Sequence, residues 1–242
     1  DLTPPAVTDI IDPNLKDASG FNADIGYRGT FKNYLNFDFS LFYLSYNNRI
    51  GVINDPTQGT SLYRTNLGET VNKGIEGFVN LNITRLFEIE KPYGNLDFFA
   101  TISFIDSRYK DFKTFTTSGT AKNVNLDGNR VENAPRYIHN LGLSWTNNNI
   151  STTLQYRMSG RIFTDATNTT TPSANGVTGI LDKYSLLDFS SEYNFLKNYN
   201  IRAGINNLFD EEYATRRSSG YPGPGILPGE GRTFYISIGA KF

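Results

Sequence analysis

The chain has 242 residues, with 23 Lys and Arg against 24 Asp and Glu, so its formal net charge is −1. The absence of Cys and the presence of a single His exclude a disulfide framework, a thiolate metal site and a multi-His zinc site. The near-neutral charge argues against a nucleic-acid-binding protein, which needs a basic surface, and the 18 Phe and 15 Tyr exclude a disordered chain.

Apolar and polar residues alternate along most of the sequence, which is the pattern of β-strands with one apolar and one polar face. Leu154 and Tyr156, for example, alternate with Thr153, Gln155 and Arg157. In chain order, the alternation predicts nine strands: Gly20–Gly29, Tyr34–Val52, Ser61–Arg85, Asn95–Lys110, Arg136–Thr146, Ile150–Phe163, Leu181–Phe195, Asn200–Arg216 and Arg232–Phe242.

The predicted connections between these strands alternate in length along the chain. The short or moderate connections are Thr30–Asn33, Glu88–Gly94, Asn147–Asn149 and Leu196–Tyr199. The long polar connections, rich in Gly, Pro, Asn, Ser and Thr, are Ile53–Thr60, Asp111–Pro135, Thr164–Ile180 and Arg217–Gly231. Transmembrane β-barrels have this arrangement, with short turns on the periplasmic side and long loops outside.

Strand length and aromatic residues also favour a membrane barrel over a soluble β-sandwich. Several predicted strands exceed about ten residues, which suits a tilted membrane strand, whereas strands in globular proteins average about five or six. Aromatic residues such as Tyr137 and Trp145 lie near predicted strand ends, like the interfacial girdles of outer-membrane barrels. We therefore expect an all-β fold, an antiparallel transmembrane β-barrel, with the soluble sandwich as the alternative.

The strand count indicates that these residues form only part of a barrel. If Phe242 ends on the periplasmic side, the last strand and the first both run downward, and Asp1–Ser19 becomes an extracellular segment. Bacterial single-chain barrels have an even number of strands, and an open sheet edge in lipid leaves costly unpaired backbone groups. We therefore expect residues 1–242 to be the C-terminal portion of a larger barrel.

Four blocks of sequence, in order, resemble the C-terminal barrel of TonB-dependent outer-membrane transporters. The blocks are Phe39–Tyr43 with Asn47–Ile50, Asn72–Gly77, Leu126–Val131 with Ala134–Arg136, and Gly204–Tyr213 with Gly231–Tyr235 and Phe242. The resemblance covers nearly the whole chain. Residues Phe163–Thr169, Pro172–Gly176 and Tyr213–Arg217 are also similar to the ferric-citrate-type branch of this family.

This resemblance implies a receptor in the outer membrane of a Gram-negative bacterium, with a 22-stranded barrel closed by an N-terminal plug. The present chain would supply the last nine strands and would lack the plug and the early strands. The implied function is active uptake of a ferric chelate, powered by the inner-membrane TonB complex through an absent N-terminal region. The partners would be the ferric chelate, the rest of the barrel with its plug, and outer-membrane lipid, without nucleic acid.

Two alternatives to ferric-chelate uptake stay open from the sequence. One is a passive porin or adhesin barrel, and the other is uptake of a different TonB-dependent substrate, such as a vitamin or a glycan. We expect no enzyme, no cofactor and no metal site. Asp210, Glu211 and Glu212 would suit a paired-carboxylate hydrolase, but neighbours on a strand end point to opposite faces, so a solvated rim is the preferred interpretation.

The candidate ligand-binding residues lie at the start of the last long connection. Arg216 and Arg217 could grip an anionic ferric chelate, because guanidinium groups bind carboxylates in bidentate fashion, and Tyr221 could pack against it. The alternative for the arginines is a salt bridge at the rim or a contact with lipopolysaccharide. Phe242, as the last residue, resembles the assembly signal of outer-membrane barrels.

Charged residues on the polar faces of two neighbouring strands are expected to face the barrel lumen. These are Arg157 and Arg161 on one strand and Asp188 and Glu192 on the next. Because interior charges prefer partners, we expect the arginines to pair with the acidic residues rather than to form a free basic path. The single His139 falls on the apolar side of its strand, which favours aromatic packing over metal binding.

Overall fold

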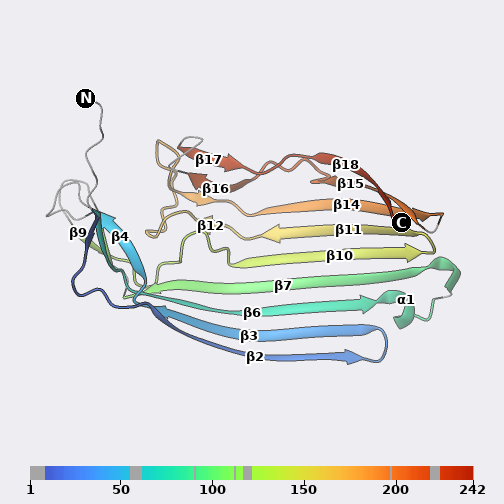
Figure 1. Ribbon diagram of the computed structural model, residues 1–242, viewed down its shortest axis with the longest axis horizontal. Helices are drawn as coiled ribbons and strands as arrows, with labels where there is room; N and C mark the ends of the chain where they lie inside the picture. Colours follow the sequence, from blue (N-terminus) through green and yellow to red (C-terminus); the bar gives the residue numbers. More distant parts are fainter. Residues whose placement is uncertain are drawn as a thin grey trace.

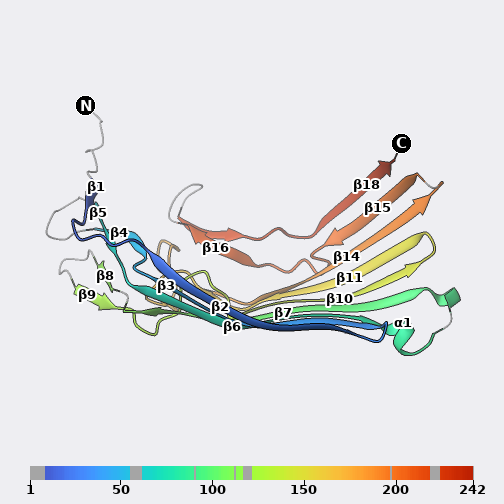
Figure 2. The ribbon, with the colours of Figure 1, turned by 60° about the horizontal axis from the view of Figure 1, so that its bottom comes forward.

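The computed structural model describes residues 9–54, 62–89, 91–111, 113–116, 122–196, 198–218 and 224–241. Its main body is one nine-stranded antiparallel sheet whose strands neighbour one another in chain order (Figure 1). The sheet strands are β2 (Ser19–Phe31), β3 (Leu35–Asn47), β6 (Glu69–Asn82), β7 (Asn95–Lys110), β10 (Tyr137–Asn147), β11 (Ile150–Ser159), β14 (Tyr184–Phe195), β15 (Tyr199–Asn206) and β18 (Thr233–Ala240). The sheet curves into an open trough (Figure 2), so the prediction of nine antiparallel strands forming part of a barrel is confirmed.

Several strands of the structure are shorter than the strands that the sequence pattern predicts. The predicted strand Tyr34–Val52 leaves the sheet after β3, because Asn48 adopts a left-handed conformation with φ of 53°. The predicted strand Asn200–Arg216 likewise stops at the end of β15, where Asn207 has φ of 53°. A left-handed residue turns the extended chain, which a period-two pattern does not reveal.

The remainders of these over-long predictions form small separate sheets. β4 (Ile50–Asn54) and β5 (Leu62–Asn66) pair, and β1 (Asp9–Ile11) joins β5 in parallel. β12 (Ile162–Phe163) pairs with β13 (Ile180–Leu181). β16 (Ala214–Ser218) pairs with β17 (Gly225–Pro228), and β8 (Lys113–Thr116) pairs with β9 (Lys122–Asn125). Thus parts of the predicted loops are hairpins.

The predicted strand Ser61–Arg85 is interrupted near its start, and it ends before Arg85. Gly68, with φ of 127°, separates β5 from β6, and the residues after β6 form the short helix α1 (Ile83–Leu86). Asn82 caps this helix, since its side-chain oxygen accepts a hydrogen bond from the backbone nitrogen of Arg85 at 2.8 Å. A 3₁₀ turn, η1 (Lys91–Tyr93), follows. Within the described part of the chain, no helix has the length and apolar character needed to cross a membrane.

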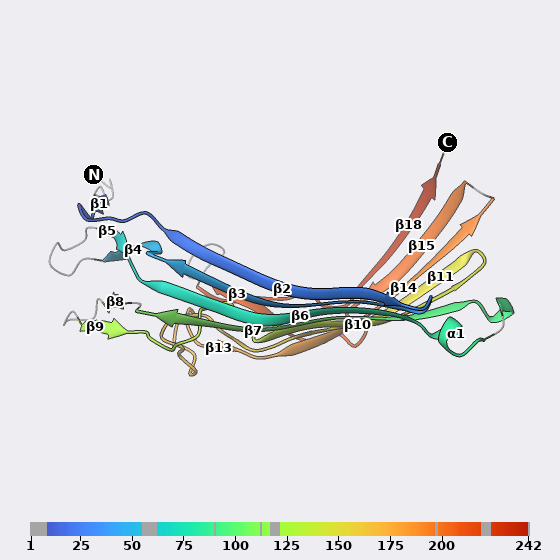
Figure 3. The same ribbon diagram turned by 90° about the horizontal axis from the view of Figure 1, so that it is seen from below.

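The long connections all lie at one end of the sheet and the short ones at the other (Figures 1 and 3). The short end carries the turns after β2, β10 and β14, and the α1 segment after β6. The long end carries the four small sheets. The alternation of connection lengths predicted from sequence is therefore confirmed, and it places all four long links at the same end of the sheet.

The two faces of the sheet differ in polarity along every strand. One row of cross-strand partners is apolar on all nine strands: Phe31, Leu35, Leu81, Phe98, Leu143, Leu154, Phe189, Ile205 and Phe234. The row one residue away, on the opposite face, includes Asp97, Ser144, Thr153, Ser190, Gly204 and Tyr235. We call these the apolar face and the polar face.

The apolar face is open, since no second sheet formed by the described residues lies against it. Phe234 is 71% exposed and Ile236 70%, and among the described residues only Tyr109, Leu126, Leu181 and Leu186 are buried apolar side chains. A β-sandwich would bury its apolar rows in a common core. The soluble sandwich alternative is therefore wrong for this fold.

Candidate functional site

The long links form one connected layer at the end of the sheet. Between the second and third links, the backbone nitrogen of Arg130 donates to the side-chain oxygen of Asn168 at 2.7 Å, and the Asn168 amide nitrogen donates to the Arg130 carbonyl at 2.8 Å. Asn129 adds a bond to the carbonyl of Ala166 at 3.0 Å. These contacts join links that are about 40 residues apart in the chain, a separation at which the cost of closing the loop must be offset by specific bonds.

A small apolar cluster supports this layer. Tyr109 at the end of β7 is 2% exposed and Leu126 is fully buried, and Leu67, Val131 and Ala166 pack against them. The Tyr109 hydroxyl hydrogen-bonds the carboxylate of Glu132, so its polar atom is satisfied in the buried position. The cluster joins the end of β7 to two residues of the second link, Leu126 and Val131, and to Ala166 of the third link, and so anchors the layer on the sheet.

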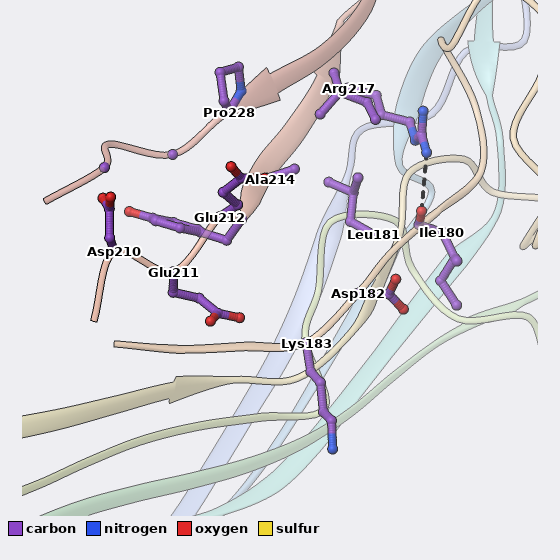
Figure 4. A pocket seen from close by; sticks show the side chains of 14 residues that line it. Ile180, Leu181, Asp182, Lys183, Asp210, Glu211, Glu212, Ala214, Arg217 and Pro228 are labelled. Carbon is purple, nitrogen blue, oxygen red and sulfur yellow. Dashed lines mark hydrogen bonds between the residues drawn. The ribbon is translucent and has the colours of Figure 1, made fainter. Parts of the chain in front are cut away.

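Beside the third and fourth links lies a cavity of about 660 Å³ (Figure 4). Its wall consists of Ile180–Lys183, Asp210–Ala214 and residues of the β16–β17 hairpin. Tyr213 packs over Gly229, where a Cβ atom would lie 2.1 Å from the ring, and stacks at a tilt on Tyr184 with ring centroids 4.4 Å apart. The cavity wall thus combines the Tyr213 ring with charged side chains.

Arg217 lines this cavity but is engaged by the neighbouring link. Its guanidinium group donates to the carbonyl of Gly176 at 2.8 Å. It also donates to the carbonyl of Ile180 at 3.3 Å (Figure 4). Its Nε atom is buried without a hydrogen-bond partner. Arg217 therefore connects the β16–β17 hairpin to the third link, which limits its freedom to bind a ligand.

Arg216 is placed differently from its neighbour. It is exposed, is not part of the cavity wall, and faces Leu227 across the hairpin. Successive residues of a strand point to opposite sides, so the two arginines do not form a joint clamp. Tyr221, the third predicted ligand residue, lies outside the described residues, as does Phe242.

Acidic side chains outnumber basic ones around the cavity. Asp182, Asp210, Glu211 and Glu212 contribute to the wall, with Lys183 and Arg217 as the cations. Asp210 also forms an ion pair with Arg232 at 3.6 Å. All three residues of the 210–212 run are exposed, in line with a solvated rim. In the part of the chain that the structure describes, no group of three or more His, Cys, Asp or Glu side chains could hold a metal ion.

Asp165 organises the start of the third link. Burial opposes its ionisation, but hydrogen bonds from the hydroxyls and backbone nitrogens of Thr167 and Thr169 outweigh this and hold the pKa of Asp165 below its usual value. The ionised carboxylate is thus the form that fits this turn. Nothing in the period-two pattern pointed to this residue.

Two ion pairs join neighbouring strands on the polar face. Arg157 pairs with Asp188 at 2.8 Å, which is the pairing that the strand alternation predicts. Glu192 pairs instead with Arg202 on β15. Arg161 follows β11 and has an exposed side chain. On the apolar face, His139 stacks on Tyr137 at 5.0 Å and meets the Phe104 ring at 4.7 Å, so its packing is aromatic.

Asn207 is a structural residue that the sequence analysis did not single out. It is 3% exposed, its amide nitrogen donates to the carbonyls of Glu211 and Glu230, and its oxygen accepts from the Glu211 nitrogen. Its backbone nitrogen also donates to the Asp188 carboxylate. An Asn directly after a strand was the available signal, since Asn tolerates the left-handed conformation and bonds the backbone nearby.

Comparison with known proteins connects this architecture to a family. A family model described as TonB-dependent receptor-like β-barrel matches residues 2–208. Among solved structures, the unliganded ferric citrate transporter FecA superposes with a TM-score of 0.75 at 22% identity, covering 92% of this chain and 31% of that one. The ferric yersiniabactin receptor FyuA of Yersinia pestis gives a TM-score of 0.67 at 18% identity, over 93% of this chain and 30% of its own.

A curated relative shares a shorter segment at higher identity. The vitamin B12 transporter BtuB of Vibrio vulnificus (strain YJ016) is 37% identical over 62 residues, which is 26% of this chain and 10% of that protein. The present chain spans about a third of the length of the similar solved structures.

Proposed function

Because the chain belongs to the TonB-dependent receptor family, whose barrels lie in the outer membrane of Gram-negative bacteria, we propose that it is the C-terminal part of a barrel that takes up a ferric chelate. The observation that carries the proposal is the superposition on the ferric citrate transporter, with a TM-score of 0.75 over 92% of this chain. In this proposal, residues 1–242 supply nine strands, and the plug and the remaining strands come from elsewhere in the receptor.

The polar face then lines the lumen and the apolar face contacts lipid. Arg157, Arg161, Asp188 and Glu192 belong to the lumen wall, where pairing of charges keeps the wall polar without a strong net field. The layer of long links lies at the extracellular end and supplies part of the capture surface. Phe242 serves the assembly of the barrel.

Within the capture surface, Arg216 and Arg217 have separate roles. Arg216 is free to grip a carboxylate of the chelate, with Tyr221 packing beside it, because a guanidinium group binds carboxylates with two parallel hydrogen bonds. Arg217 positions the hairpin through the third link. Transport itself would require the plug and energy from the inner-membrane TonB complex, through a region outside this chain.

Growth and uptake assays test this function in the native bacterium. A strain lacking the receptor gene should lose uptake of radiolabelled iron from ferric citrate or another ferric chelate, and a strain lacking TonB should lose it equally. Uptake that persists without TonB would show a passive pore. Uptake of labelled vitamin B12 but of no ferric chelate would show that the substrate is vitamin B12 instead. The segment shared with the vitamin B12 transporter is the reason for testing this second substrate.

Substitutions in the complete receptor test the residue roles. Arg216→Ala should weaken binding of the ferric chelate by about tenfold, the effect of losing one charge-assisted contact of about 1.5 kcal/mol. The matched control is Arg232→Ala, which removes an arginine that directly follows the same link and is paired with Asp210. Equal effects of the two variants would mean that Arg216 does not contact the chelate.

A further inference from the structure

The third link contains the one Asn-Gly pair of the chain, Asn175–Gly176. An asparagine before a glycine is prone to spontaneous deamidation, because the glycine nitrogen attacks the side-chain carbonyl carbon and no neighbouring side chain hinders the attack. The reaction needs water but no enzyme and no cofactor. Asn175 is exposed, so water reaches it. The pair lies where the third link meets the fourth, so its modification has a structural consequence.

In the closed turn, hydrogen bonds occupy both groups that would react. The backbone nitrogen of Gly176, which is the nucleophile of this reaction, donates to the carbonyl of Ser173 at 2.8 Å. The side-chain oxygen of Asn175 accepts from the Ser173 hydroxyl at 2.8 Å and from the backbone nitrogen of Val177 at 3.2 Å. Attack requires the nitrogen to leave its acceptor and to approach the side-chain carbon to about 3–3.5 Å. The turn must therefore open before Asn175 reacts.

The fourth link keeps this turn closed. Arg217 donates to the carbonyl of Gly176 at 2.8 Å, so it fixes the residue whose nitrogen is the nucleophile. Gly176 has φ of 72° and lies against Gly225, because a Cβ atom on Gly176 would be 3.1 Å from the Cα atom of Gly225. The two links therefore meet with no space for an additional carbon atom between them.

We propose that Asn175 is a site of spontaneous deamidation that Arg217 restrains, and that its isoaspartate product separates the third link from the fourth. The Gly176 nitrogen forms a bond to Cγ of Asn175, the bond from Cγ to Nδ2 breaks, and ammonia leaves with the proton of the Gly176 nitrogen. Water then opens the resulting succinimide ring. Opening at the main-chain carbonyl gives isoaspartate, and opening at Cγ gives aspartate, without any change in oxidation state.

The two products differ in their effect on the links. Isoaspartate carries the backbone through Cβ and Cγ, so the chain before Gly176 becomes one carbon atom longer. Because Gly176 already touches Gly225, it cannot keep both this contact and its bond from Arg217. Aspartate keeps the original backbone path, and its carboxylate still accepts the two bonds that hold the turn. Arg217 belongs to the cavity wall, so isoaspartate formation also changes that wall, whichever substrate the receptor carries.

Deamidation rates in the complete receptor test the restraint by Arg217. The receptor, its Arg217→Ala variant and a urea-unfolded sample are incubated at mildly alkaline pH. Peptide mass spectrometry measures the modified fraction at residue 175, and labelling by isoaspartyl methyltransferase counts isoaspartate. We expect the folded receptor to react about tenfold more slowly than the unfolded chain, and Arg217→Ala to react about fivefold faster than the unsubstituted receptor.

The matched control for these rates is Arg216→Ala, which should react like the unsubstituted receptor because Arg216 does not bond the third link. If Arg217→Ala does not fold, Ser173→Ala takes its place, since it removes the hydroxyl bond to Asn175 and should also accelerate the reaction. An unmodified folded receptor after complete reaction of the unfolded chain would overturn the proposal. Equal rates in the receptor and in the Arg217 variant would overturn it as well.

Hydrogen exchange tests whether isoaspartate releases the links. Exchange of residues 176–180 and of β17 is followed by mass spectrometry in fresh and aged receptor, with β7 as the check that the wall stays folded. We expect faster exchange in the fraction that carries isoaspartate. The Asn175→Asp variant introduces the charge without the longer backbone and should exchange like the fresh receptor. Unchanged exchange in the aged receptor, or equal acceleration in Asn175→Asp, would refute the release.

Discussion

The nine-stranded sheet and the layer of long links at its end are stabilised in different ways. In the sheet, each strand repeats the same alternation, and rows of cross-strand partners carry it across the whole wall. In the links, a few side chains such as Asn168, Asn207 and Arg217 bond the backbone of a distant segment. The comparison indicates that the wall tolerates substitutions that respect its two faces, whereas each link depends on single residues.

The largest expected effect breaks the two-faced wall. Leu154→Arg puts a charge into an apolar row that runs through all nine strands, and should destabilise the complete barrel by about 2–4 kcal/mol if it faces the middle of the bilayer. Thr153→Arg, on the polar face, is the matched control and should cost much less. Urea unfolding in phospholipid vesicles measures both, and similar losses would contradict the assignment of faces.

The next effect tests whether one buried amide holds the fourth link. Asn207→Ala leaves the carbonyls of Glu211 and Glu230 and the nitrogen of Glu211 without their partner, which should cost about 1–3 kcal/mol locally. Amide exchange at Glu211 measures it. Asn206→Ala removes only an exposed bond to Thr233 and should leave this exchange unchanged; a rise of equal size would argue against the special role of Asn207.

A smaller effect is expected where two links meet at Arg217. Arg217→Ala removes the donors to Gly176 and Ile180. It should lower the free energy of local opening of residues 176–180 by about 1 kcal/mol without changing the free energy of unfolding of the wall. Arg216→Ala serves as the control. Hydrogen exchange by mass spectrometry distinguishes them, and unchanged exchange in the Arg217 variant would show that the third link is held elsewhere.

The smallest effect concerns pH and the turn at Asp165. Its pKa is lowered in the folded chain, so the ionised form stabilises the turn above the usual value of 3.8, and this stabilisation is lost as the pH falls through the folded pKa. Exchange at Thr167 and Thr169, corrected for intrinsic rates, should therefore increase from about pH 6 to about pH 3. Asp165→Asn should remove the pH dependence, and its persistence would assign the titration to another group.

How far the sequence predicted the structure differs between the same two regions. The predicted bounds Asn95–Lys110 are those of β7, because no Gly or Pro interrupts the alternation of this segment. The strand predicted from Ser61 to Arg85 contains a break at Gly68 and a helix capped by Asn82, since a local left-handed conformation and a cap override the average pattern. For the site, the sequence pointed to Arg217 but not to its carbonyl partners, which lie some 40 residues away.

By itself, the sequence determined the faces of the wall, the alternation of connection lengths and the family resemblance, because each depends on short-range periodicity or on contiguous motifs. Only the tertiary structure decided that Arg216 and Arg217 point to opposite sides of their hairpin, that Arg217 bonds the third link, and that Asn168 and Asn207 bond the backbone of the links. The physical reason is register: which residues of distant strands and links face each other is fixed by backbone pairing and turn geometry, and a one-residue change would separate them.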